Sequence, residues 1–223
     1  MSSTSCAPDA ASERLRGDLA RLFAAHDADG AVAAAVAATS AGSVPVERLY
    51  CAVLVPLLEG VGTRWHTGEM RVWEEHLESA AIRAVIEAVR PQVRSAHEAV
   101  VAAHAGERVR KALFACPPEE WHVLSLRMLA DRFKMEGWDS YYLGADVPAE
   151  EIVDAARALA VDLVVLTAAT HYERLYLRDL VEGIRAQLSG ARLLVGGPAF
   201  SRDHASWSAE ELVDPDAIPS AYA

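Results

Sequence analysis

The chain has 223 residues, of which 52% are hydrophobic and 24% charged, and its formal net charge is −11 at pH 7. This length allows one large domain or two ordinary ones, each able to bury a core without support from disulfides. The negative charge repels a phosphate backbone, so the sequence predicts no direct binding of nucleic acid.

Leader segments and cysteines indicate the compartment. No basic stretch followed by an apolar run opens the chain, as a secretory signal would require, and no apolar run is long enough to span a bilayer. The cysteines Cys6, Cys51 and Cys116 are widely spaced and form no zinc or redox motif. We therefore predict a cytoplasmic protein that has no membrane association and needs no disulfide.

The first half has helical periodicity. Residues 1–11 are polar and are expected to form a disordered tail, after which apolar residues recur at helical spacing over 12–104. Four helices are predicted, with starts near residues 12, 31, 43 and 69. Ser43 is the expected N-cap of the third helix, and Pro91 should stop or kink the fourth. This half is predicted to be an all-α four-helix bundle.

From residue 107 the pattern changes to short apolar runs that alternate with amphipathic helices. Strands are predicted over 109–115, 140–143, 163–167 and 193–195. This alternation predicts a Rossmann-like (flavodoxin-like) parallel sheet in a domain over 107–223. The fold class is therefore α/β with an all-α N-terminal domain. After residue 200 only a short helical pattern around 210–213 is visible.

Ligands bind such sheets at the carboxyl ends of the strands, which here correspond to the loops 116–122, 144–148, 167–172 and 196–200. His122 lies in the first of these loops near the start of a helix. Glycines in the second and fourth loops would let the backbone approach a large ligand closely. The GxGxxG fingerprint is absent, so the usual dinucleotide site is excluded.

Over about residues 107–200 the sequence resembles the cobalamin-binding domains of corrinoid methyl carriers, mutases and light-responsive regulators. The positions that match the family pattern are Glu120, His122, Ser125, Gly144, Asp146, Thr167, Ala169, Gly196 and Gly197. The resemblance implies a cobalamin whose cobalt is ligated from below by His122. It also implies that Glu120, in place of the family's aspartate, orients the imidazole.

A second motif lies in the helical half. Trp65-His66 is followed by Val72, and nine residues separate Trp65 from Glu75-His76. This spacing resembles the Trp-x9-Glu-His motif of the CarH-type adenosylcobalamin photoreceptors. The resemblance implies that the helical bundle caps the upper face of the cofactor, with Trp65, Val72, Glu75 and His76 around the adenosyl group. His66 would ligate cobalt after light has removed that group.

The resemblance therefore implies a light sensor and not an enzyme. Photolysis of adenosylcobalamin would change the conformation, and with it the association of the chain with itself or with a regulatory protein partner. CarH-type regulators also carry an N-terminal helix-turn-helix domain, which we do not find, so we expect a stand-alone sensor or a trimmed chain. Stand-alone photocobilins hold a bilin beside the cobalamin. His171-Tyr172 and Tyr141-Tyr142 are the candidates for lining such extra space.

Other functions remain open at this point. A corrinoid protein that carries methyl groups between two methyltransferases would use the same domains and His122, with an upper face open to its partner. An interaction module without cobalamin would require both motifs to be accidental. A cobalamin-dependent mutase is disfavoured because the chain has no substrate barrel.

Overall fold

The computed structural model describes residues 6–169, 174–188, 190–201, 207–208, 211–215 and 217–221. The chain divides into two compact units, Met1–Ala96 and His97–Ala223. The boundary falls inside helix α6 (Arg90–Ala103), earlier than the break that the sequence pattern predicts. No helix within the described ranges has the length and apolar character needed to cross a membrane.

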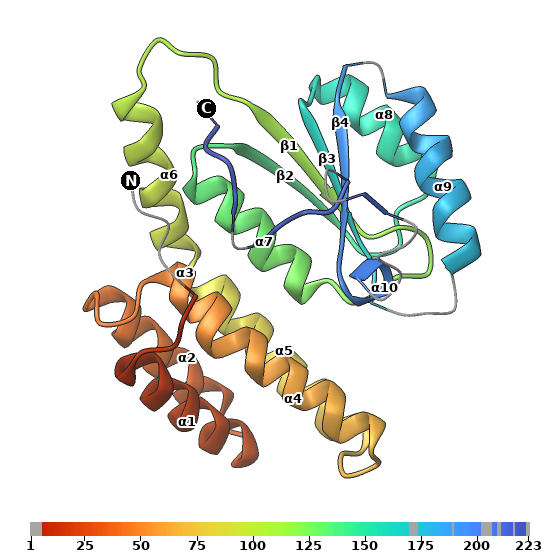
Figure 1. Ribbon diagram of the computed structural model, residues 1–223. Coiled ribbons are helices and arrows are strands. Elements are labelled where there is room, and N and C mark those ends of the chain that lie inside the picture. The colour runs from red at the N-terminus through yellow and green to blue at the C-terminus, as the bar shows by residue number, and fades with distance from the viewer. Residues whose placement is uncertain are drawn as a thin grey trace. The chain divides into compact units, whose positions relative to one another are not determined.

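Four helices build the bundle of the first unit over residues 6–89 (Figure 1). They are α1 (Ala10–Ala24), α2 (Ala28–Ser40), α5 (Val72–Ala88) and a long helix composed of α3 (Val46–Arg48), the π-helical segment η1 (Leu49–Leu54) and α4 (Val55–His66). Helix α1 packs against α2 and η1, and α5 packs against α2 and α4. Leu19, Tyr50, Leu54, Ile82 and Ile86 are fully buried. The predicted four-helix bundle is confirmed.

The helix ends differ from the prediction where local hydrogen bonds decide them. Asp27 caps α2 by accepting a hydrogen bond of 2.8 Å from the Gly30 backbone N–H. A Cβ atom at position 30 would lie 2.3 Å from that carboxylate, so Gly30 permits this cap from inside the helix. The expected cap Ser43 is wrong, because its hydroxyl donates to the Ala38 carbonyl and α3 begins after Pro45.

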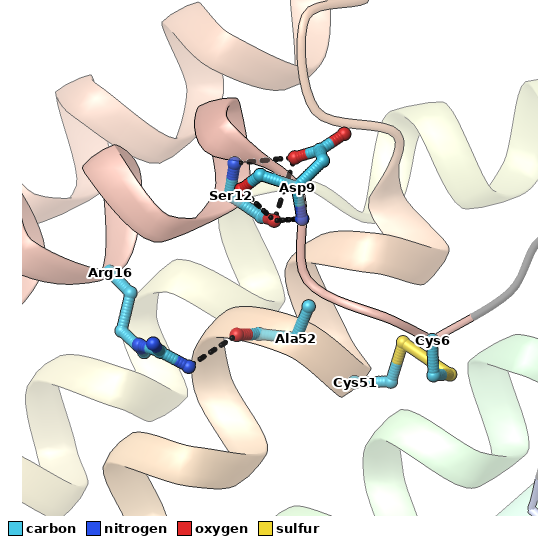
Figure 2. Close-up of a disulfide and its surroundings, with 6 residues drawn as sticks. All are labelled: Cys6, Asp9, Ser12, Arg16, Cys51 and Ala52. Carbon is cyan, nitrogen blue, oxygen red and sulfur yellow. Dashed lines mark hydrogen bonds between the residues drawn. A yellow bond between two sulfur atoms is a disulfide. The ribbon is translucent and has the colours of Figure 1, made fainter.

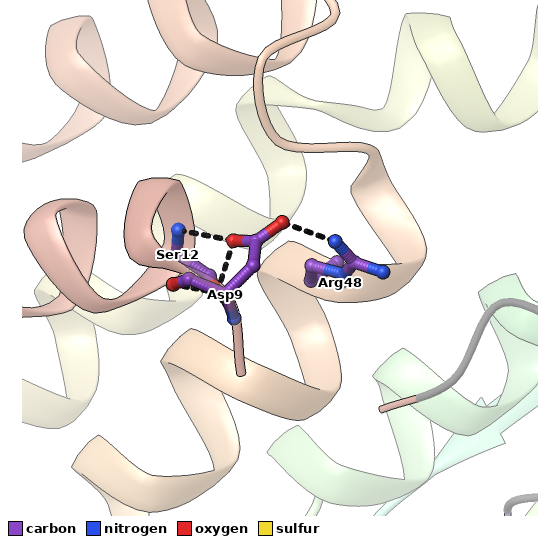
Figure 3. A network of polar contacts seen from close by, with 3 residues as sticks. All are labelled: Asp9, Ser12 and Arg48. Atoms are coloured by element: carbon purple, nitrogen blue, oxygen red, sulfur yellow. Dashed lines mark hydrogen bonds and ion pairs between the residues drawn. The ribbon is translucent and has the colours of Figure 1, made fainter. Parts of the chain in front are cut away.

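The N-terminal segment is tied to the third helix. Cys6 forms a disulfide with Cys51, which lies in η1 (Figure 2). Asp9 caps α1 by accepting a hydrogen bond of 2.8 Å from the Ser12 backbone N–H, and it forms an ion pair with Arg48 (Figure 3). Helix α1 therefore begins inside the predicted tail. We expected a chain that needs no disulfide, and the structure instead contains one between Cys6 and Cys51.

The second unit is a parallel sheet between two layers of helices (Figure 1). Strands β1 (Lys111–Ala115), β2 (Asp139–Gly144), β3 (Leu163–Thr167) and β4 (Arg192–Gly196) are arranged in the order β2-β1-β3-β4. Helix α7 (Leu124–Met135) covers one face, and α8 (Ala149–Leu159) and α9 (Arg174–Gln187) cover the other. Strand β3 is buried along its whole length, as expected for a parallel sheet covered on both faces. The predicted Rossmann-like fold is confirmed.

Beyond β4 the chain forms the short helix α10 (Pro198–Ser201) and later returns to the sheet. The Val195 N–H donates to the Glu211 carbonyl, and the Val213 N–H donates to the Val195 carbonyl at 2.9 Å. Residues 211–213 thus lie alongside β4, and the helical pattern predicted there is wrong for these residues. Residue 210 lies outside the described part of the chain.

Candidate functional site

The loops after β1, β2 and β3 meet around one carboxylate. In this sheet the strand order reverses between β1 and β3, which is where open α/β sheets bind ligands. Glu120 Oε2 accepts a hydrogen bond of 2.6 Å from the Ala169 backbone N–H, and this bond joins the loops after β1 and β3. The Asp146 N–H donates to the Glu120 carbonyl at 3.1 Å, which adds the loop after β2. The structure therefore brings these predicted loops together.

The same carboxylate holds His122. Glu120 Oε1 is 2.6 Å from His122 Nδ1 and accepts a hydrogen bond of 2.8 Å from the His122 backbone N–H. The carboxylate is buried, whereas the imidazole is 63% exposed. The preceding residue, Glu119, has a φ of 66°, and its N–H donates to Asp146 Oδ1 at 2.8 Å. A strained, tightly bonded loop therefore presents a single imidazole to the outside.

Protonation states follow from these contacts. Burial opposes ionisation of Glu120, but hydrogen bonds from the His122 ring, the His122 N–H and the Ala169 N–H outweigh burial and lower the pKa of Glu120 to about 2. A carboxylate only accepts hydrogen bonds, so Nδ1 of His122 is its protonated donor. The neutral ring then has its lone pair on Nε2, the arrangement of a metal-ligating histidine with a carboxylate behind it.

The glycine pair at the end of β4, Gly196 and Gly197, has a role within the protein. Gly197 has a φ of 94°, and a Cβ atom there would lie 2.5 Å from the Ala168 carbonyl oxygen. A Cβ atom at Gly196 would lie 2.5 Å from a methyl group of Val213. Both positions therefore need glycine for contacts between the β3 loop, the β4 loop and residues 211–213, whatever ligand they also meet.

Of three further predicted positions, two are the last residues of strands, Gly144 in β2 and Thr167 in β3. Gly144 has a φ of 94°, and its carbonyl accepts a hydrogen bond of 2.8 Å from the Cys116 N–H. The buried Thr167 hydroxyl is 3.6 Å from Cys116 Sγ, and burial raises the pKa of this thiol to about 11. Ser125 is exposed in the first turn of α7. Cys116 is a residue of this region that sequence reasoning missed.

The second predicted group lies at the end of the α4–α5 hairpin in the helical unit. Trp65 and His66 form the last residues of α4, and Val72 begins α5 after the short connection 67–71. Trp65 is 52% exposed and Val72 is 58% exposed, which is unusual for large apolar side chains. His66 and His76 are also exposed. This end of the unit therefore offers a mixed apolar and imidazole surface.

The Glu75-His76 pair is held by its own helix. The Glu75 carboxylate forms a short contact with His76 Nδ1 through Oε2, and its Oε1 accepts a hydrogen bond of 2.6 Å from the Ser79 hydroxyl. Ser79 lies four residues after Glu75, so the two side chains share one helix face. This spacing is visible in the sequence, but a serine there is too common a feature to be singled out.

Sequence reasoning missed an exposed indole and an ion pair. Trp121, between Glu120 and His122, is 67% exposed, although the family pattern treats its position as variable. Arg64 donates to both oxygens of Glu78, at 2.7 and 2.8 Å, and thereby joins α4 to α5. Nothing in the sequence marks this pair, because fourteen positions separate its members.

The tyrosines considered as extra lining have other contacts. Tyr142 lies under the Arg127 guanidinium, which is 4.9 Å from its ring centroid. Tyr141 is partly buried against the core beside α8 and α9. His171 and Tyr172 lie outside the described residues.

Comparison with known proteins identifies both units. Residues 15–90 and residues 110–216 each match a family model described as a B12 binding domain. The chain is 34% identical over 163 residues to the HTH-type transcriptional repressor CarH of Myxococcus xanthus, a match that covers 73% of this chain and 50% of that protein. The chain thus spans about half the length of this curated relative.

A solved structure shares the fold of both units. The monomethylamine corrinoid protein of Methanosarcina barkeri matches with a TM-score of 0.70 and 18% identity, over 84% of this chain and 86% of that one. At this identity the match establishes the fold alone. The matched ranges include Trp65 and Glu75 in the bundle and His122 in the loop after β1. Cobalamin binding is therefore the property that the sequence comparisons support.

Proposed function

We propose that this chain, a member of the cobalamin-binding proteins through its two B12 binding domains, is a light sensor that uses adenosylcobalamin. The observation that carries the proposal is the exposed group at the end of the α4–α5 hairpin, where Trp65 and Val72 accompany His66 and the Glu75-His76 pair. The 34% sequence identity to the repressor CarH, over 163 residues and therefore across both units, supports the proposal.

The sheet unit fits a corrinoid. Neutral imidazole would suit cobalt, a borderline transition metal, as a ligand from the protein. His122 offers Nε2 with its tautomer fixed by Glu120, and it lies at the point where the strand order reverses. We assign His122 as the lower ligand. Ser125, Gly144, Asp146, Thr167, Ala169, Gly196 and Gly197 are the proposed surroundings of the cofactor in this unit.

The helical unit is proposed to supply the upper face. Trp65 and Val72 offer apolar area that would exclude water from the adenosyl group. Glu75 is held in place by Ser79, so its carboxylate can accept a hydrogen bond from a ribose hydroxyl without first being ordered. His66 follows Trp65 directly and is the proposed upper ligand after illumination.

When bound, adenosylcobalamin supplies a cobalt–carbon bond that visible light breaks, while the protein supplies orientation. Trp65 would be the residue that covers the adenosyl group, and its loss of that apolar neighbour would favour a different position of the end of α4. Ligation by His66 would stabilise that position and give a two-state switch. Its output is proposed to be light-dependent association with a second copy of the chain or with a regulatory protein partner.

The test is an absorbance spectrum of the chain reconstituted with adenosylcobalamin, in the dark and after green illumination, with size exclusion on both samples. We expect a rapid spectral change together with a shift in apparent size. Tight binding without any light-dependent change would contradict the sensor and support the methyl-carrier alternative, which shares the corrinoid-protein fold. If the chain does not bind cobalamin, the remaining alternative is an interaction module without the cofactor. An additional absorbance band in protein purified from cells that make bilins would report a bilin.

Two variants assign the ligands. His122→Ala should abolish binding in which the protein replaces the cofactor's own base, and an unchanged affinity and spectrum would remove His122 from its role. His66→Ala should bind in the dark like the unmodified chain but give a different spectrum after light. Identical spectra after light would show that His66 is not the upper ligand.

A further inference from the structure

An ion pair between α4 and α5 lies beside the proposed upper-face group. Arg64 Nη2 donates to Glu78 Oε1 at 2.7 Å and to Glu78 Oε2 at 2.8 Å. The Glu78 side chain is only 9% exposed, whereas that of Arg64 is 41% exposed. Loss of Arg64 would therefore leave a largely buried carboxylate without this cation.

The position of the pair connects it to both halves of the motif. Arg64 immediately precedes Trp65 and His66 at the end of α4. Glu78 lies three residues after Glu75 on α5, which is about one helical turn. The pair therefore fixes the last turn of α4 against the turn of α5 that carries the Glu75 carboxylate.

The backbone at the end of α4 reinforces this anchor. The Arg64 carbonyl accepts a hydrogen bond of 3.0 Å from the Met70 N–H, and Met70 is buried. Arg64 Nε donates to the Gly60 carbonyl at 3.3 Å, which orients the guanidinium along α4. Trp65 and His66 thus extend from a residue that is fixed on both its main chain and its side chain.

We propose that Arg64 and Glu78 are positioning residues of the light response, an inference that rests on the proposed function. Their ion pair keeps the end of α4 in register with α5, so that His66 can take the upper ligand position once the adenosyl group has left. Neither side chain needs to touch the cofactor. The pair acts through Trp65 and His66 on one helix and through Glu75 on the other.

The experiment follows the spectrum after a light pulse in chains loaded with adenosylcobalamin. Arg64→Lys keeps the charge but loses the guanidinium, whose Nη2 contacts both Glu78 oxygens while its Nε donates to the Gly60 carbonyl. The double variant Arg64→Met with Glu78→Leu removes the pair and leaves apolar side chains, a replacement that often preserves stability. We expect both to retain cobalamin binding in the dark through His122 and to form the His66-ligated spectrum at least tenfold more slowly.

Arg48→Met is the matched control, because it removes another arginine–carboxylate pair of the same unit, the one with Asp9. It should lower the unfolding temperature and leave the spectral change at the rate of the unmodified chain. Unmodified kinetics in both Arg64 variants would overturn the inference, as would an equal slowing in Arg48→Met. Failure of the unmodified chain to bind cobalamin or to respond to light would instead overturn the proposed function.

Discussion

Glu120 is the residue on which the proposed ligand site depends. Its two oxygens accept hydrogen bonds from His122 and from the Ala169 backbone, so truncation releases both the imidazole and the loop after β3. Loss of such a partner behind a ligating histidine typically costs about 10–100-fold in affinity. We expect Glu120→Ala to weaken cobalamin binding by about this factor, measured by absorbance titration in the dark.

Glu120→Gln separates charge from shape. Its amide keeps an oxygen that can accept from one N–H, but it cannot match the carboxylate toward both His122 and Ala169. We expect an affinity between that of the unmodified chain and that of Glu120→Ala. If all three chains bind equally, Glu120 does not orient the ligand.

The buried Cys116 thiol makes the free energy of unfolding depend on pH. Burial raises the pKa of this thiol from 9.0 to about 11, so the folded chain favours the protonated form. The contribution to stability is complete below pH 9 and is lost as the pH rises toward 11, because the unfolded thiol ionises first. We expect the free energy of unfolding to fall by up to about 1.4 kcal/mol per pH unit in this window.

The measurement compares urea unfolding of the unmodified chain and of Cys116→Ala from pH 8.5 to 10.5, since other groups also titrate there. The difference between the two curves should carry the Cys116 contribution. If the difference in unfolding free energy between the two chains stays constant from pH 8.5 to 10.5, the Cys116 thiol does not contribute to the pH dependence. In the folded chain at pH 7, Cys116 should also resist alkylation in a mass-spectrometric assay.

At the scale of elements, the disulfide between Cys6 and Cys51 joins the N-terminal segment to η1. The bond closes a loop with a sequence separation of 45 residues, and such a disulfide typically contributes about 2–4 kcal/mol of stability. We expect Cys6→Ser, or reduction of the unmodified chain, to lower the unfolding temperature by several degrees. Addition of reductant to Cys6→Ser is the control and should have no further effect. Equal unfolding temperatures for the oxidised and reduced chains would show that the bond does not stabilise the unit.

Gly197 and Gly183 form a matched pair in the sheet unit. Alanine at 197 would need a φ of 94° and would place its Cβ 2.5 Å from the Ala168 oxygen, whereas a Cβ at 183 meets no atom within 4 Å. We expect Gly197→Ala to cost about 2 kcal/mol or more, and Gly183→Ala in α9 to stabilise by about 0.5–1 kcal/mol. Thermal unfolding of both variants is the measurement. A stable Gly197→Ala variant would show that the β3 and β4 loops do not need this close approach.

Sequence periodicity predicted the elements well where burial controls them. Strand β3 lies where its continuous apolar run predicted it, and Pro91 does mark a break, between α5 and α6. Helix starts were predicted less well. Asp27 caps α2, which begins at Ala28 and not near residue 31, and Ser43 bonds back to Ala38. Such caps depend on single side-chain hydrogen bonds, which periodicity does not report.

Contacts between residues that are far apart in the chain were the hardest feature to predict from the sequence. The family pattern pointed to Glu120 and His122, and the structure places them in contact. The pairing of Cys6 with Cys51 and of Arg64 with Glu78 could not be derived, because each depends on how helices pack. Gly197 was expected to make room for a ligand, but its Cβ would first meet the protein's own backbone.

At the scale of the whole molecule, the chain consists of two compact units with separate cores, which predicts two thermal transitions for the apoprotein. Under the proposed function, adenosylcobalamin binds residues of both units, and a ligand present at 100 times its dissociation constant stabilises whatever it binds by about 2.7 kcal/mol. We therefore expect dark calorimetry of the loaded chain to show both transitions at higher temperature. Cys6→Ser identifies the transition of the helical unit, since that unit contains the disulfide.

The variant Trp65→Ala makes this prediction specific to the upper face. It should reduce the cofactor-induced rise in the unfolding temperature of the helical unit. The rise for the sheet unit, which depends on His122, should stay unchanged. Illumination should reduce the helical shift of the unmodified chain, because the adenosyl group that Trp65 is proposed to cover has left, and ligation by His66 should then restore part of it. If cobalamin raises only the sheet transition in the dark, the helical unit does not hold the cofactor, and the methyl-carrier function becomes the better account of both domains.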